Sequence, residues 1–182
     1  MISEKDAILA CQAGKTEMYR TLVEKYKSRA YYTALMYTKN RDDALDLSQE
    51  AFYRAYRALN RFNPDKNFYT WFYKILRNVC LNFITRKREN VPISDGTNPG
   101  AVLSETDGQP DEIFERNERS AAIEKALNHL KEKDREIIIL KEFDGMSYNE
   151  IAEVLAIPLG SVMSRLYYAR KKLLKELEYL NE

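Results

Sequence analysis

The stretch that decides the fold is residues 144–173, DGMSYNEIAEVLAIPLGSVMSRLYYARKKL. Ser147 and Glu150 have the spacing of a capping box, in which the serine caps an N3 amide and the glutamate reaches back to the cap. Pro158 prevents the first helix from continuing. The pattern predicts a short helix after Ser147 and a second helix over about 159–177, joined as a helix-turn-helix.

The outward face of this second helix carries small polar and cationic side chains. Between Ser161 and Lys175 there are five basic residues and no acidic one. Recognition helices use short polar and arginine side chains for base edges, and cations for phosphates. The pattern indicates a DNA-reading helix, although a surface helix with a solvated basic face has the same composition. The outward residues are Ser161, Ser164, Arg165, Tyr168, Lys171 and Lys172.

A second basic segment, residues 66–88, carries interleaved aromatic side chains. It holds six basic residues and no acidic one. Aromatic rings spaced along a cationic helix offer stacking surfaces for unpaired bases, and the cations hold the backbone. Phe72 and Val79 lie on one helical face with Ile75 and Leu76, and we expect that face to be buried. Two alternatives remain for Tyr69, Trp71 and Tyr73: their rings contact nucleic acid, or they are buried in the core.

A third feature is an acidic patch in DALDLSQEAF, residues 43–52. Asp43, Asp46 and Glu50 recur at helical spacing on an otherwise basic half of the chain. Such a patch can dock a cationic partner protein. The spacing alone favours an ordinary solvated helix face.

Charge is segregated along the 182 residues, whose formal net charge is only +1. Residues 1–90 hold 17 basic and 10 acidic residues, residues 91–118 hold 1 and 7, and residues 119–182 hold 11 and 11. Six of the chain's glycines and prolines fall between Pro92 and Pro110, where few apolar side chains could be buried. We therefore predict domains over 1–89 and 113–182, joined by a flexible acidic linker over 90–112.

Apolar residues outside the linker follow helical periodicity. Ala7, Ile8 and Cys11 begin the first stripe, and later stripes run through about 22–37, 44–59 and 68–88. No segment alternates with the period of a strand. The fold class is predicted to be all-α, with four helices in each of two small domains.

Composition also excludes several functions. Cys11, Cys80 and His129 are too few for a disulfide framework, a zinc site or histidine-based catalysis, so we expect no metal, no cofactor and no enzyme activity. The longest aliphatic run is far too short to span a bilayer, and the polar N-terminus lacks a secretory signal. The end at Glu182 argues against a C-terminal sensory extension.

Taken together, these motifs resemble the extracytoplasmic-function (ECF) sigma factors of bacterial RNA polymerase over nearly the whole chain. The segment 43–62, DALDLSQEAFYRAYRALNRF, is similar to the family's helix that binds the clamp helices of the β′ subunit. The segment 68–88, FYTWFYKILRNVCLNFITRKR, resembles the helix that opens the minus-ten element, and the loop 60–67 corresponds to one that captures a flipped base. The segment 144–173 resembles the minus-thirty-five reader.

The resemblance implies a role for individual residues and partners. Polymerase binding would fall to Asp46, Gln49, Glu50 and Phe52. Minus-ten DNA would contact Phe62, Lys66, Tyr69, Trp71, Lys74, Arg77 and Asn78. Minus-thirty-five DNA would contact Ser147, Ser161, Ser164, Arg165, Tyr168, Lys171 and Lys172. The expected partners are core RNA polymerase, through its β′ and β subunits, promoter DNA and an anti-sigma factor. We expect no small-molecule substrate and no membrane insertion. The expected location is the bacterial cytoplasm, at the nucleoid.

The recognition helix departs from the family pattern at three positions. Ser161 replaces a threonine, Met163 a lysine or arginine, and Tyr168 an arginine, whereas Ser164, Arg165 and Arg170 match. Two cations are thus absent from the DNA-facing helix, which predicts an unusual minus-thirty-five preference.

Two other classes of function compete with this interpretation. A stand-alone regulator using only the helix-turn-helix would usually be a dimer on a palindrome and would need neither the basic aromatic helix nor Gln49 and Glu50. An enzyme acting on nucleic acid would need paired carboxylates, a phosphate-binding loop or metal ligands, and the sequence lacks these patterns. The acidic linker resembles the family's connector toward the polymerase cleft, but a solubilising spacer fits equally well.

Overall fold

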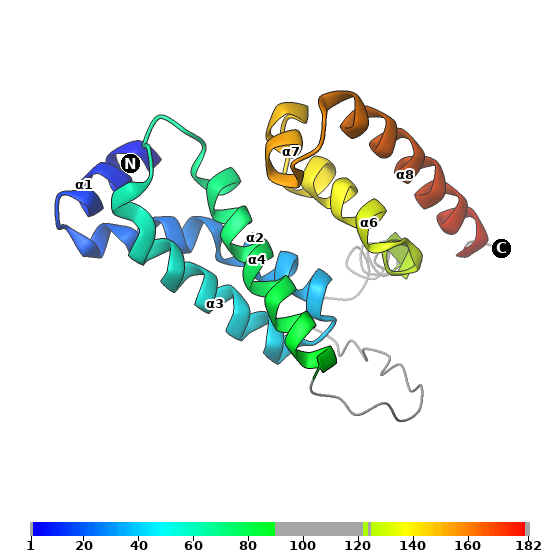
Figure 1. Cartoon of the computed structure of the whole chain (residues 1–182), viewed down its shortest axis with the longest axis horizontal. Helices are drawn as coiled ribbons and strands as arrows, with labels where there is room; N and C mark the ends of the chain where they lie inside the picture. Colours follow the sequence, from blue (N-terminus) through cyan, green and yellow to red (C-terminus); the bar gives the residue numbers. More distant parts are fainter. Residues whose placement is uncertain (1, 90–121, 124, 181–182) are drawn as a thin grey trace, which may run out of the picture. The chain divides into compact units, whose positions relative to one another are not determined.

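The computed structural model describes residues 2–89, 122–123 and 125–180, all of whose regular elements are helices (Figure 1). The chain divides into two compact units, residues 1–101 and 102–182. The all-α prediction with two helical units is confirmed. The predicted linker over 90–112 lies outside the described residues, and the domain boundaries stay a prediction.

Four α-helices make up the N-terminal unit as far as Glu89, where its described residues end. Ser3 and Asn40 begin two of them, because their side chains accept hydrogen bonds from the amides of Asp6 and Asp43. Lys39, with φ of 54°, ends the helix before Asn40 in a left-handed conformation. The elements are α1 (Glu4–Gln12), a 3₁₀ turn (Thr16–Met18), α2 (Tyr19–Thr38), α3 (Arg41–Ala58), a 3₁₀ turn (Leu59–Arg61) and α4 (Phe68–Glu89).

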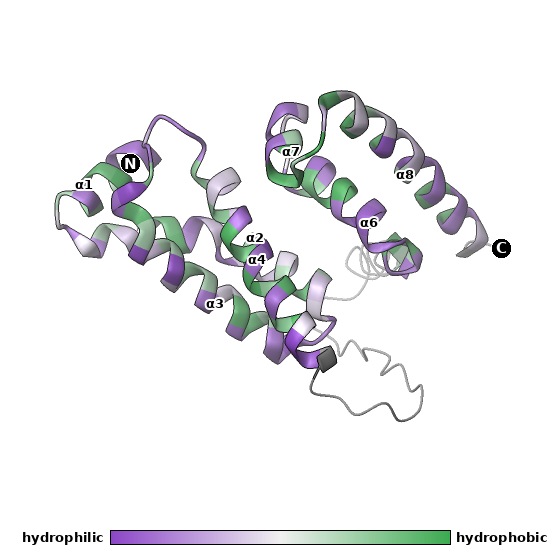
Figure 2. Cartoon of the chain, in the orientation of Figure 1, coloured by the Kyte–Doolittle hydropathy of each residue, from purple (hydrophilic) through white to green (hydrophobic). Residues whose placement is uncertain are grey.

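The core of this unit lies between α2, α3 and α4, which pack against one another. Small residues such as Ala30 and Ala51 are fully buried and let the helices approach closely, while Phe72 and Leu76 fill the space between them. Hydrophobic residues recur turn by turn along α3 between hydrophilic ones, as in an amphipathic helix (Figure 2). Cys11 and Cys80 are buried free thiols in α1 and α4.

The C-terminal unit contains the predicted helix-turn-helix. Residues 122–123 and 125–129 are helical, followed by α6 (Glu132–Ile138), a π turn (Ile139–Phe143), α7 (Tyr148–Leu155) and α8 (Leu159–Leu180). Ile137, Leu140, Ile151, Val162 and Leu166 form its buried centre.

The capping box predicted at the start of the first helix of this motif is present. Ser147 and Glu150 form both hydrogen bonds of a capping box. Gly145 precedes them with φ of +63°, and Ala156 ends α7 in the left-handed region with φ of 53°. The second helix runs to Leu180, one turn beyond the predicted end, and the π turn was not predicted.

No helix in the described part of the chain is long and apolar enough to cross a membrane.

Candidate nucleic-acid and partner interfaces

The predicted polymerase-binding residues lie on α3, but they do not share one environment. Asp46 and Gln49 are exposed, and Glu50 accepts a hydrogen bond from Arg54 at 2.6 Å. Phe52 is buried instead, with its ring centroid 4.5 Å from that of Phe72. An exposed polar surface on α3 is therefore formed by the first three residues, while Phe52 anchors α3 to α4.

The acidic start of α3 is tied to the basic end of α4. Lys87 donates a hydrogen bond to the Asp43 carboxylate at 2.9 Å. Asp43 thus belongs to a contact within the unit, whereas Asp46 and Gln49 are exposed and Glu50 is partly exposed.

The loop before α4 brings two predicted minus-ten residues together. Asn67 accepts a hydrogen bond from the Thr70 amide at 3.0 Å and so caps the start of α4. Phe62 is buried, and its ring centroid lies 4.7 Å from that of the partly exposed Trp71. Lys66 is exposed in the same loop. The loop therefore places a cation beside a half-open aromatic pair.

Tyr69 is buried and so does not offer the stacking surface for DNA bases that was expected of it. Its side chain is 2% exposed, because it faces α2. Its ring stacks on Tyr26 at 5.1 Å, and its hydroxyl lies 3.4 Å from that of Thr33. Tyr73 is likewise buried, with its hydroxyl 3.3 Å from that of Tyr37. Both tyrosines belong to the α2–α4 interface.

Sequence reasoning missed Arg29, which lies at this interface. Its guanidinium lies 3.6 Å from the Tyr69 ring centroid, a close cation–π contact. No motif pointed to Arg29, because only the packing of α2 on α4 brings it to the ring. Buried Tyr69 therefore positions a partly exposed cation beside α4.

The remaining minus-ten residues follow one side of α4. Lys74, Arg77 and Asn78 share a helical face at i, i+3 and i+4 spacing. Asn78 is exposed, and Lys74 and Arg77 are partly exposed. This face joins two cations to an amide that can both donate and accept hydrogen bonds.

On α8, most predicted minus-thirty-five residues are accessible. Ser161, Ser164, Tyr168 and Lys171 are exposed, and Arg165 is partly exposed. Ser164 donates a hydrogen bond to the Gly160 carbonyl oxygen at 2.9 Å, within the helix.

Two other predicted contacts have structural partners. Lys172 pairs with the nearly buried Asp134 of α6 at 2.5 Å. Ser147 accepts from the Glu150 amide at 3.2 Å and donates to the Glu150 carboxylate at 2.8 Å. Lys172 therefore fixes α8 to α6, and Ser147 fixes the start of α7.

An ion pair holds the middle of α8 to the π turn. Nε and Nη2 of Arg170 donate to Oε1 of Glu142 at 2.9 and 2.5 Å. This hydrogen bond raises the pKa of the Arg170 guanidinium above its ordinary value. Nearby, the Lys141 ammonium lies 5.0 Å from the Tyr148 ring centroid.

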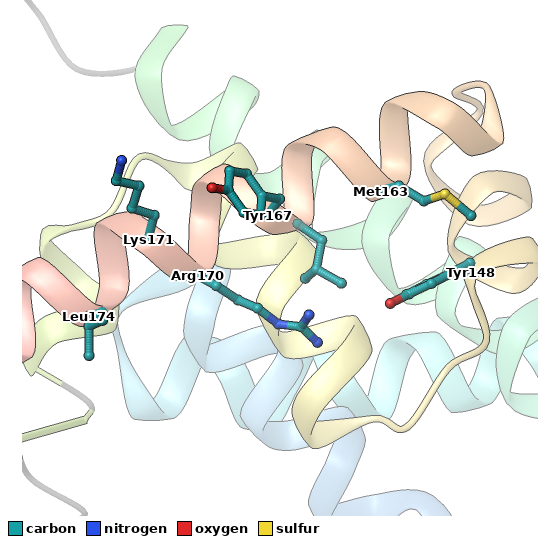
Figure 3. Close-up of a pocket in the computed structure, with 7 residues that line it drawn as sticks. Tyr148, Met163, Tyr167, Arg170, Lys171 and Leu174 are labelled. Atoms are coloured by element: carbon teal, nitrogen blue, oxygen red, sulfur yellow. The ribbon is translucent and has the colours of Figure 1, made fainter.

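A hollow of about 510 Å³ opens between α7 and α8, and Figure 3 shows its lining. Met163 and Tyr148 lie at one end, and Lys171 and Leu174 lie at the other. We call it the α7–α8 hollow. Its lining residues are Tyr148, Met163, Leu166, Tyr167, Arg170, Lys171 and Leu174.

Across the described residues, no three His, Cys, Asp or Glu side chains gather as metal ligands would.

Comparison with known proteins assigns both units to one family. Residues 22–90 match the model of sigma-70 region 2, and residues 120–173 match that of sigma-70 region 4. The chain is 34% identical to the RNA polymerase sigma-H factor of Pseudomonas aeruginosa, over 93% of this chain and 91% of that protein. The chain belongs to the ECF sigma factors. It is 33% identical to the ECF RNA polymerase sigma-E factor of Escherichia coli K12, over 88% and 86% of the two chains.

Solved structures agree with this membership. The sigma factor RpoE of Bartonella quintana, in complex with the anti-sigma factor NepR, superimposes with a TM-score of 0.74 at 25% identity, over 88% of this sigma factor and 96% of that chain. CnrH, in complex with the cytosolic domain of CnrY, shares the fold with a TM-score of 0.70 at 22% identity, over 97% of both chains. The family consists of transcription initiation factors.

Proposed function

We propose that this sigma factor binds core RNA polymerase and directs it to promoters that it reads at two separate elements. The observation that carries the proposal is the pair of surfaces on the N-terminal unit. Asp46 and Gln49 of α3 form an exposed polar patch, whereas Lys74, Arg77 and Asn78 line a basic face of α4. One unit can thereby hold a protein and a nucleic acid at the same time.

The α3 patch is the proposed docking surface for the clamp helices of the β′ subunit. Its carboxylate and amide groups suit a cationic helical partner. Phe52 contributes by packing on Phe72, which fixes the rotation of α3 and hence the direction of Gln49.

The start of α4 is the proposed site for the melted minus-ten strand. The partly exposed Trp71 offers the aromatic surface, the buried Phe62 packs beside it, and Lys66 supplies a cation for the backbone. Extruding a base costs a few kcal/mol of unstacking, which contacts with Trp71 and Lys66 can offset. Tyr69 acts indirectly, because its buried ring holds Arg29 beside the helix.

The start of α8 is the proposed reader of duplex DNA at the minus-thirty-five element. Ser161, Ser164, Arg165 and Tyr168 face outward over its first three turns. The capping box and the ion pair between Lys172 and Asp134 hold α7 and α8 in place, so the reader is positioned before DNA arrives.

An anti-sigma factor is the proposed regulatory partner. The support is the likeness to RpoE of Bartonella quintana, which was solved with the anti-sigma factor NepR.

The test is run-off transcription by bacterial core polymerase on a promoter library, with and without the full chain. We expect the sigma factor to select a set of templates that share two spaced elements. Asn78→Ala should weaken selection at the downstream element, and Arg165→Ala should weaken binding by about 1–3 kcal/mol if the guanidinium contacts a guanine. The exposed Tyr179, near the end of α8, provides a control as Tyr179→Gln.

If the chain never directs synthesis from any template, the initiation role is wrong. A pull-down of core polymerase with residues 1–90 then separates the two explanations. Loss of that interaction would favour a stand-alone regulator that uses only the helix-turn-helix.

A further inference from the structure

The recognition helix has an apolar face that hydrogen bonding to base edges does not require. Met163 and Tyr167 lie one turn apart on α8 and are 49% and 63% exposed. Both line the α7–α8 hollow, and Met163 lies near Tyr148 (Figure 3). In the proposed function α8 enters the major groove, where an exposed apolar side chain can bury its surface against an apolar group of a base.

The major groove offers one such partner, the C5-methyl group of thymine. The other groups on its floor are hydrogen-bond donors and acceptors, which serines and arginines read. An apolar side chain therefore distinguishes thymine from other bases by a group that polar side chains cannot detect.

The rim of the hollow suits a DNA strand better than an apolar protein surface. Arg170 and Lys171 both line it, and α8 carries no acidic residue between Ser161 and Lys175. Although Arg170 is engaged by Glu142, the exposed Lys171 offers a cation beside the apolar lining. A phosphate backbone beside a thymine methyl presents the complementary pair of features.

We propose that Met163 and Tyr167 form a subsite for a thymine methyl group in the upstream promoter duplex. The subsite rests on the proposed function, in which α8 reads duplex DNA. Met163 is the specificity-determining residue, because its flexible thioether chain can close on a methyl group. Tyr167 forms the neighbouring part of the apolar surface.

The test uses the full chain assembled with bacterial core polymerase. A pool of duplexes randomised upstream is selected for binding, and the selected sequence is resynthesised with each upstream thymine replaced in turn by deoxyuridine, which lacks only the methyl group. We expect about a fourfold loss of affinity at one or two positions, the effect of burying one methyl group.

Two variants test whether the loss of affinity on removing the methyl group depends on the α7–α8 hollow. Met163→Gln keeps the length of the side chain but should bind the thymine and uracil duplexes equally at the sensitive position. Tyr179→Gln changes a more exposed residue of the same helix, outside the hollow, and should keep the fourfold preference. Placing 5-methylcytosine in place of cytosine at that position should raise affinity for the wild type and not for Met163→Gln.

The outcomes separate this subsite from the proposed function. Selection of a defined upstream duplex that binds equally well with thymine and uracil overturns the subsite alone. Retention of the preference by Met163→Gln also overturns it. If Met163→Gln impairs assembly with polymerase and leaves methyl preference intact, the hollow belongs to a protein partner. Failure to select any duplex overturns both proposals.

Discussion

At the scale of single residues, two side chains of the same type that are adjacent in the sequence can have different contacts in the structure. Lys171 and Lys172 are adjacent, cationic and both exposed, yet the Lys172 ammonium pairs with Asp134 whereas Lys171 lines the α7–α8 hollow. The difference comes from the helical rotation of 100° between neighbours, which turns only Lys172 toward α6. Neighbouring cations on α8 therefore have different surroundings.

Replacing Lys172 tests its structural role. Lys172→Ala should reduce the local stability of α6 and α8 by about 1 kcal/mol, because it leaves the nearly buried Asp134 carboxylate without its cation, while solvent screens part of the loss. Hydrogen exchange of peptides from α6 and α8, followed by mass spectrometry, measures this change. Lys171→Ala is the control and should leave exchange unchanged. Equal exchange in both variants would contradict the structural role.

Cys80 gives a second prediction, on thiol reactivity. Burial raises the pKa of the Cys80 thiol to about 12, so the folded chain holds almost no thiolate at pH 8. The contribution of this thiol to stability is present below about pH 9, where an unfolded thiol is also protonated, and is lost as the pH rises toward 12.

Alkylation by iodoacetamide checks this prediction in a Cys11→Ala background, which leaves one thiol. We expect labelling of Cys80 in denaturant but negligible labelling of the native chain at pH 8. Rapid labelling of the native chain, at the rate of a small free thiol, would show that Cys80 is accessible.

At the scale of elements, sequence signals predict helix ends better than they predict which faces are buried. Ser147 and Pro158 fixed the helix-turn-helix to within a turn, because capping and proline geometry act locally. Tyr69 could not be placed in this way, since an aromatic residue in a basic segment suits a core or a nucleic acid. Only the packing of α2 decides its burial. The π turn at residues 139–143 also lacks a local signal.

Because Met163 and Tyr167 give α8 an apolar face, we expect its affinity for duplex DNA to depend only weakly on salt concentration. Met163→Lys adds a cation on the DNA-reading helix, so the slope of log affinity for duplex DNA against log salt concentration should steepen by about one unit. Tyr179→Lys adds the same charge near the end of α8 and serves as the control. A titration of affinity between low and physiological salt measures the slopes. Equal slopes for both variants would show that position 163 does not approach a phosphate.

At the scale of the whole molecule, the proposed reading surfaces lie in separate compact units, one on α4 and one on α8. Two weak contacts on one chain bind cooperatively, because the first holds the second at high effective concentration. A near-neutral chain can therefore select promoters without tight binding by either unit alone.

Because the two proposed sites are separate, we expect the losses of promoter-binding free energy from substitutions in each to add. The free-energy cost of Asn78→Ala combined with Arg165→Ala should equal the sum of the single costs to within about 0.5 kcal/mol. Affinity of the assembled polymerase for a selected promoter measures all three variants. A double variant no worse than either single one would mean that the two residues serve one contact.

The hydrogen bond from Ser164 to the Gly160 carbonyl oxygen restricts which bases this serine can recognise. A hydroxyl group has a single proton, and here the helix backbone accepts it, which leaves only lone pairs pointing outward. In this rotamer Ser164 can accept from the exocyclic amino group of adenine or cytosine, but it has no proton for O6 or N7 of guanine.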